Sequence, residues 1–187
     1  MANSTSILGG GLLCALFFNA SGFSGEIHKA AESGDLAKVQ SLLEGDSQLV
    51  SSKDDNWGMT ALHWAAREGK IGVAEFLLSK GADVNAKNTT PSRQQPLLFV
   101  SQRGYADLAN LLLTHGADVN ARNVYGETAL HFAVMSGYKS VVELLLAHKA
   151  NINARTIGST GQTPLDIAER LKRDDLAALL RQSRGQK

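Results

Sequence analysis

Short stretches of regularly spaced apolar residues, each followed by a glycine, fill most of this chain. The pattern is clearest between Thr60 and Gly81, where two such stretches have the spacing of one helix face. Their apolar positions are Leu62, Ala65, Ala66, Val73, Phe76, Leu77 and Leu78. Thr60 can cap the first stretch, and Gly69 and Gly81 can take the left-handed conformation that ends a helix. The pattern therefore predicts pairs of short helices.

Two sequence phrases recur at a nearly constant interval. The phrase Gly-Ala-Asp-Val-Asn-Ala at residues 81–86 returns 35 residues later at 116–121 and, degraded, 33 residues after that at 149–154. The phrase Thr-Ala-Leu-His-Trp-Ala at residues 60–65 returns as Thr-Ala-Leu-His-Phe-Ala at 128–133. A single helix pair cannot bury its own apolar face, so at least about three such units must stack.

These phrases resemble the signature of the ankyrin repeat family, whose unit of about 33 residues carries Thr-Pro-Leu-His-x-Ala. The resemblance runs from about Gly25 to the C-terminus. It implies an all-α solenoid of five stacked helix-turn-helix units joined by hairpin-like turns, which binds another protein. The predicted units are residues 25–54, 55–87, 88–122, 123–155 and 156–183, followed by a polar tail at 184–187.

Some units depart from the pattern. The turn of the third unit, residues 88–96, is two residues longer than usual, and Leu98 replaces the histidine. The fifth unit also has a long turn and places Asp166 at the histidine position. Lys29 stands where interior units have an aromatic residue, as expected of a unit that faces water at the end of a stack.

The chain begins with an apolar segment that is separate from the repeats. Residues 7–18 carry no charge, and this stretch is shorter than the roughly 20 residues that span a bilayer. Small residues follow at 20–25, although residues 1–6 contain no Lys or Arg. We expect residues 1–24 to be a signal peptide, cleaved after Gly22 or Ser24, and the protein to be exported to the periplasm or secreted. The alternatives are an uncleaved membrane anchor formed by residues 7–18 and a disordered leader.

Composition argues against several kinds of site. The net charge of +1 gives no sign of a nucleic-acid partner. The one cysteine, Cys14, allows neither a disulfide framework nor a cysteine-based metal site. We expect no cofactor and no metal, and we expect the protein to be a monomer.

Five histidines are the first candidates for catalysis or metal binding. His28, His63 and His131 occupy one repeat position, where the resemblance implies that the imidazole ties down the adjacent turn. Stacking holds such residues about 10 Å apart, which is too far for neighbouring imidazoles to share a zinc ion. Asp83 and Asp118 recur in turns, where their carboxylates can accept from backbone amides. Because the chain also lacks the common catalytic motifs, we expect a protein that is not an enzyme.

The resemblance places the partner along the hairpin tips and the exposed face of the first helices. The residues that map to this surface are Asn56, Trp57, Met59, Arg67, Glu68, Arg93, Gln102, Arg103, Val124, Tyr125, Glu127 and Met135. Large apolar residues such as Trp57 and Tyr125 are not required by the scaffold and are typical of interface hot spots. The alternative is that they pack within neighbouring turns. An accessory or stress-protection factor that supports a neighbouring enzyme is the other function considered.

Overall fold

A computed structural model describes residues 20–158 and 161–184, and this part of the chain is helical with no strand. The helices, in chain order, are α1 (Ala20–Ser33), α2 (Leu36–Gly45), the 3-10 helix η1 (Ser47–Ser51), α3 (Ala61–Arg67), α4 (Ile71–Ser79), α5 (Pro96–Arg103), α6 (Ala106–Thr114), α7 (Ala129–Ser136), α8 (Lys139–Ala147), α9 (Pro164–Arg170) and α10 (Asp174–Arg184). The all-α solenoid expected from the repeats is confirmed.

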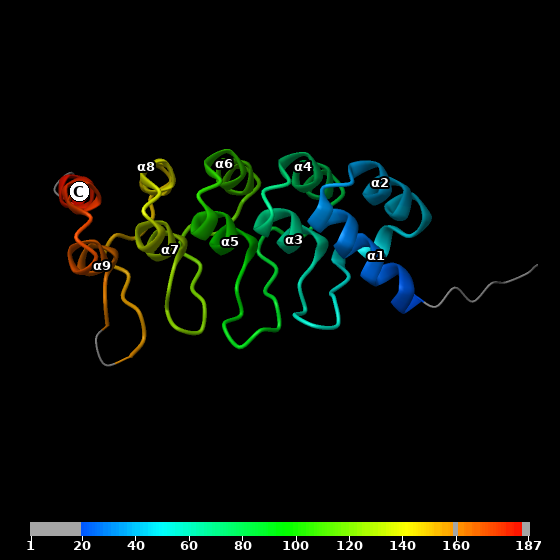
Figure 1. The fold of residues 1–187 in the computed structure, drawn as a ribbon, viewed down its shortest axis with the longest axis horizontal. Coiled ribbons are helices and arrows are strands. Elements are labelled where there is room, and N and C mark those ends of the chain that lie inside the picture. The colour runs from blue at the N-terminus through cyan, green and yellow to red at the C-terminus, as the bar shows by residue number, and fades with distance from the viewer. Residues whose placement is uncertain (1–19, 159–160, 185–187) are drawn as a thin grey trace, which may run out of the picture.

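The helices form two rows (Figure 1). The first helix of each pair (α1, α3, α5, α7 and α9) contacts its neighbours in one row, and the second helices (α2, α4, α6, α8 and α10) do the same in the other. Hairpin-like tips project from the first-helix row, away from the second-helix row. Buried leucine, valine and alanine side chains from both rows form one continuous core. Each pair thus buries its apolar face only against its neighbours, as the stacking argument requires.

Two buried histidines each connect their own unit to the next. The Nδ1 atom of His63 accepts a hydrogen bond (3.1 Å) from the N–H of Thr60, the N-cap residue of α3. The Nε2 atom lies 3.2 Å from the carbonyl oxygen of Gln94, in the next tip. His131 repeats both contacts, to the N–H of Thr128 (3.1 Å) and to the carbonyl of Gln162 (3.2 Å). The predicted structural role of these imidazoles is confirmed, and it extends across two units.

Asparagine and aspartate side chains hold the turns that follow the second helices. Asp83 and Asp118 each accept from a backbone N–H two residues on, at 2.9 Å. Asn85 reaches the next unit, where it donates to the carbonyl of Gly116 (3.0 Å) and accepts from the N–H of Asp118 (2.9 Å). These carboxylates therefore stabilise turns, as expected.

The two ends of the stack differ from its interior. At the C-terminal end, α10 buries Leu176 and Leu180 but exposes Asp175 and Arg181, so its outer face is polar. Asp166 accepts from the N–H of Thr163 (2.8 Å), as the histidines do in α3 and α7. At the other end Lys29 is exposed, as predicted.

The first helix begins before the expected start of the first unit. Helix α1 begins at Ala20, whereas the sequence places the first unit from Gly25. The expected cleavage positions after Gly22 and Ser24 therefore lie within α1. The apolar residues 7–18 lie outside the described residues, so the signal peptide remains a prediction. Across the part that the structure describes, no helix is both long and apolar enough to cross a membrane.

Candidate partner-binding surface

Each hairpin tip is closed by a backbone hydrogen bond between its first residue and the residue before the next helix cap. These bonds run from the N–H of Asp54 to Met59 (2.9 Å), Asn88 to Gln94 (3.0 Å), Asn123 to Glu127 (3.0 Å) and Thr156 to Gln162 (3.0 Å). The first residue also folds its tip through its side chain. Asp54 accepts from the N–H of Trp57 (2.6 Å), and Asn123 accepts from the N–H of Tyr125 (3.0 Å). Such contacts are typical of Asx turns.

Backbone hydrogen bonds also join each tip to the next. The N–H of Thr89 donates to Trp57 (3.0 Å), that of Val124 to Ser92 (3.1 Å) and that of Ile157 to Tyr125 (2.7 Å). Trp57 and Tyr125 thus occupy equivalent places, as predicted, and Ser92 is their counterpart in the third unit. The tips lie side by side along one edge of the stack (Figure 1), and these hydrogen bonds connect them.

Large apolar side chains are exposed along this edge. Trp57 is 51% exposed, Tyr125 53%, Val124 42% and Ile157 70%. We call these residues the apolar tip row. Sequence reasoning missed Ile157, although it directly follows Thr156 just as Val124 follows Asn123, and its alignment with Val124 was the available signal. The alternative that Trp57 and Tyr125 are packed away within neighbouring turns does not hold in this structure.

The prediction that Met59 lies on the partner-facing surface is wrong. Its side chain is only 2% exposed. Met59 directly precedes the cap Thr60, and an apolar residue at that position commonly packs against the start of its helix. Met135 is half-buried against the core, and its carbonyl accepts from Arg173 (3.1 Å). Both methionines therefore contribute more to packing than the sequence suggested.

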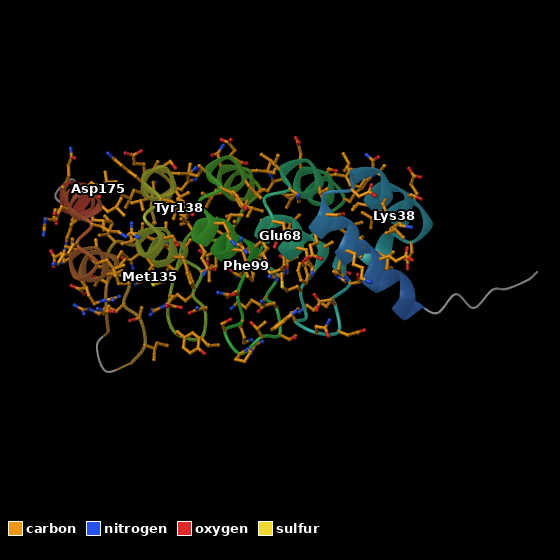
Figure 2. The ribbon with its side chains drawn as sticks, viewed as in Figure 1. Lys38, Glu68, Phe99, Met135, Tyr138 and Asp175 are labelled. Atoms are coloured by element: carbon orange, nitrogen blue, oxygen red, sulfur yellow. The ribbon has the colours of Figure 1, made fainter. Side chains whose placement is uncertain are left out.

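The exposed face of the first helices carries mostly polar groups. Arg67 lies over the ring of Trp64, 5.0 Å from its centroid, and pairs with Glu68 at 3.3 Å. Gln102 and Arg103 are exposed near the end of α5. Figure 2 shows Glu68, Phe99 and Met135 along the first-helix row, from the end of α3 to α7.

Three further predicted residues lie on the tips in different roles. Asn56 is exposed. Glu127 is half-buried because its carboxylate accepts from the side chain of Asn123 (2.8 Å). Arg93 is exposed and has a φ of 52°, where the equivalent residues Gly58 and Gly126 have 58° and 74°. An arginine therefore occupies a left-handed position that glycine fills in two neighbouring tips.

The titratable groups near the tips serve the fold. Burial lowers the pKa of His63 to about 4 and also lowers that of His131. Burial raises the pKa of Asp54, but hydrogen bonds from the N–H of Trp57 and the indole of Trp64 outweigh it, so the net shift is downward. With its ring nitrogens occupied and its side chain buried, His63 is not placed to act on a substrate. No three His, Cys, Asp or Glu residues gather as metal ligands in the described part of the chain.

Comparison with known families agrees with this geometry. The family described as ankyrin repeats (3 copies) matches residues 26–88 and 97–187. The chain belongs to the ankyrin repeat family. Ankyrin repeats are protein–protein interaction modules, so the coarse function predicted from the repeats is confirmed.

Individual relatives share only a segment with this chain. Palmitoyltransferase AKR1 of Naumovozyma castellii is 44% identical over 64 residues, 34% of this chain and 8% of that protein. The Transient receptor potential cation channel subfamily A member 1 homolog of Caenorhabditis elegans is 44% identical over 63 residues, 34% of this chain and 5% of the relative. Inversin of Gallus gallus is 38% identical over 68 residues, 36% of this chain and 6% of the relative. The matched segment is thus less than a tenth of each of these relatives.

Proposed function

We propose that this protein is a non-catalytic binding module whose protein partner lies along the hairpin tips and the adjacent first-helix face. The observation that supports this most is the apolar tip row. Four of the large exposed apolar residues of the described chain belong to it: Trp57, Val124, Tyr125 and Ile157. The hydrogen bonds between tips use the backbone amides and carbonyls of these residues, not their side chains. The side chain of Ile157 additionally lies beside Gly126 of the preceding tip. Exposed Trp and Tyr side chains on a rigid frame are characteristic of interface hot spots.

The other exposed apolar residues have a different setting. Ile71, Tyr138 and Leu171 lie at helix ends away from the tips. Tyr138 packs over Gly104, where an added Cβ would lie 2.4 Å from its ring. The partial exposure of Tyr138 is therefore compatible with a packing role. The tips remain the surface whose exposed apolar side chains are best explained by binding to a partner.

The absence of catalysis is part of the proposal. Its support is that His63, His131, Asp83 and Asp118 each make the structural hydrogen bonds described above. The relatives also carry names as different as a palmitoyltransferase, a cation channel homolog and inversin, and they share with this chain only a short segment. A similar segment in proteins with such different names is more consistent with a role in protein binding than with a shared catalytic activity.

Binding by the tips is tested with Tyr125→Ala. The partner is first recovered with the full chain by affinity purification and identified by mass spectrometry, and its affinity is then measured by calorimetry. We expect Tyr125→Ala to weaken binding by at least about 1 kcal/mol with an unchanged melting temperature. The matched control is Lys139→Ala on α8, where the lysine is exposed and pairs only weakly with Glu143 at 4.0 Å. Equal affinities for Tyr125→Ala and the original protein would exclude this surface, and so would a lower melting temperature as the only effect.

We further propose that the protein is exported and that residues 1–24 are removed. The support is the uncharged segment 7–18 followed by small residues. N-terminal sequencing of protein from its native host tests this, with a mature chain expected to start near Phe23 or Gly25. Recovery of an intact Met1 from a soluble cytoplasmic fraction would contradict it, and an intact chain in the membrane fraction would favour an anchor at residues 7–18.

A further inference from the structure

A groove lies at the N-terminal end of the stack. It is lined by α1 from Gly25 to Glu32, by the first tip from Asp54 to Trp57, and by Trp64 of α3. Its volume is about 230 Å³, below the roughly 300–1,000 Å³ of typical small-molecule sites. This size fits one side chain of a protein partner better than a free ligand.

One wall of the groove contains a buried polar atom without a partner. His28 is 3% exposed, and its Nδ1 atom has no hydrogen-bond partner in the described structure. Its Nε2 atom lies 3.1 Å from the carbonyl of Ser52, which can only accept, so Nε2 carries the hydrogen. In the neutral imidazole Nδ1 is therefore an acceptor.

Comparison with the other two histidines explains this free acceptor. Nδ1 of His63 lies 2.8 Å from the hydroxyl of Thr60, and that of His131 lies 2.9 Å from the hydroxyl of Thr128. The residue three positions before His28 is Gly25, which has no hydroxyl and lines the groove. Because α1 begins at Ala20, the N–H of Gly25 also lies within the helix and not at its start. Nδ1 of His28 consequently lacks both of the donors that its counterparts use.

The other walls favour a cation. The carboxylates of Asp55 and Glu32 are exposed, and neither pairs with a described basic residue. Asp54 adds a third carboxylate, whose two oxygens accept from the first tip and from the Trp64 indole (2.7 Å). Lys29 is the one lysine or arginine among the residues that line the groove. Trp57 and Trp64 supply aromatic rings, and Arg67 already lies over that of Trp64.

We propose that this groove receives an arginine side chain of the partner protein. A guanidinium group stacks on indole rings, pairs with carboxylates through two parallel N–H donors, and can donate a further hydrogen bond. The exposed ring of Trp57 provides a face for stacking. Hydrogen-bond acceptors are provided by the carboxylates of Asp55 and Glu32 and by Nδ1 of His28. The inference rests on the proposed protein-binding function and assigns one chemical feature to the partner.

The chain has two tryptophans, and both line the groove, so their indole N–H signals report on its occupation. The full chain, labelled with ¹⁵N, is titrated with a capped Gly-Ser-Gly-Arg-Gly-Ser-Gly peptide and with the same peptide carrying citrulline, which has the arginine shape without its charge. We expect the arginine peptide to shift both indole signals to saturation and the citrulline peptide to bind about tenfold more weakly. Equal shifts from both peptides, or none from the arginine peptide, would overturn the proposal.

Two variants test the walls of the groove. Asp55→Asn should weaken the arginine peptide about threefold or more, and the matched control Glu75→Gln, an exposed carboxylate on α4, should leave it unchanged. Gly25→Thr should weaken binding by supplying His28 with a hydroxyl, while Gly25→Ala should not. An added Cβ at Gly25 meets no atom within 4 Å, so both variants should fold. Equal affinities for Asp55→Asn and Glu75→Gln would contradict the proposal, as would dimer formation that Asp55→Asn abolishes, because a second copy would then fill the groove.

The peptide experiment is independent of the tip experiment. It needs no native partner, and Tyr125 does not line the groove. If the arginine peptide does not bind, but Tyr125→Ala weakens binding of the native partner as expected, only this inference is excluded. If the arginine peptide binds, but Tyr125→Ala leaves partner binding unchanged, only the tip surface is excluded.

Discussion

At the residue scale, Arg93 illustrates how a residue on a binding surface can lower the stability of the fold through its backbone conformation. Its φ of 52° lies in the left-handed region that Gly58 and Gly126 occupy in other tips. A non-glycine residue in that region costs roughly 1–2 kcal/mol. Such strain persists when surrounding structure fixes it, and it is concentrated at functional sites. The exposed guanidinium of Arg93, on the same edge as the apolar tip row, is consistent with retention for binding.

Replacement of Arg93 by glycine should separate stability from binding. We expect Arg93→Gly to raise the free energy of unfolding by up to about 1 kcal/mol, because relief of strain exceeds the greater flexibility of glycine in the unfolded chain. Affinity for the partner should fall. Urea unfolding and calorimetry measure the two effects. A loss of stability in Arg93→Gly would show that the guanidinium supports the tip itself.

His63 predicts a specific dependence of stability on pH. An unfolded histidine titrates near 6.5, whereas burial lowers the pKa of folded His63 to about 4. Between these values the unfolded chain binds more protons, so stability should be full above about pH 6.5 and should fall as pH decreases toward 4, by roughly 3 kcal/mol. His131, whose pKa is also lowered, should add to the loss.

Urea midpoints between pH 7.5 and pH 4 test this dependence. Asp54 contributes in a different range, because its lowered pKa removes stability only as pH falls below its ordinary value of 3.8. A midpoint that stays constant from pH 7 to pH 4.5 would show that neither histidine is protonated more readily in the unfolded chain.

At the element scale, each interior second helix is held between the helices on either side of it. Helix α6 contacts α4 and α8, and its Leu112 is fully buried in the shared core. The tip of the third unit, which contains α6, closes over a longer span, from Asn88 to Gln94, than the tip from Asn123 to Glu127. The helices of this unit nevertheless occupy the regular rows (Figure 1). The longer turn is thus accommodated at the tip and does not displace the helices.

Truncation of Leu112 tests this packing. We expect Leu112→Ala to cost about 2–5 kcal/mol of unfolding free energy, a large part of the roughly 5–15 kcal/mol of a whole domain. The control is Leu171→Ala, since Leu171 is exposed at the end of α9. Thermal melting compares them, and equal melting temperatures would contradict the described position of α6.

At the scale of the whole molecule, helices contact mainly adjacent units, so stability should vary with position along the stack. In the part of the chain that the structure describes, an interior unit has two neighbours, and the unit formed by α9 and α10 has one. Local opening of the last unit therefore needs to break one interface, while opening of an interior unit breaks two.

Leu180→Ala should make this difference visible. Leu180 is fully buried in α10, so its truncation should increase hydrogen exchange in α9 and α10 far more than in α3 to α6. Leu112→Ala should instead increase exchange across the stack. A uniform increase caused by Leu180→Ala would show that the stack opens as one cooperative unit.

The repeat period, the helix pairs and the structural histidines follow from sequence because local chemistry dictates them. Thr60 and His63 lie three residues apart and form a helix cap wherever that phrase recurs, and the glycines that end helices need no distant contact. The same holds for the turn carboxylates Asp83 and Asp118, which bond within their own turns. The amino-acid sequence by itself determines these features, since the groups that form them are only a few residues apart.

Exposure of individual side chains, in contrast, depends on contacts between units. Met59 and Trp57 belong to one tip, yet one is buried and the other is half exposed, because bonds such as that from His63 to Gln94, 31 residues apart, orient each tip against the next. The exposure of Ile157 and the unpaired Nδ1 atom of His28 likewise became evident only from the tertiary structure. Sequence periodicity predicts which residues are equivalent, but which side chain faces solvent is set only when neighbouring units pack together.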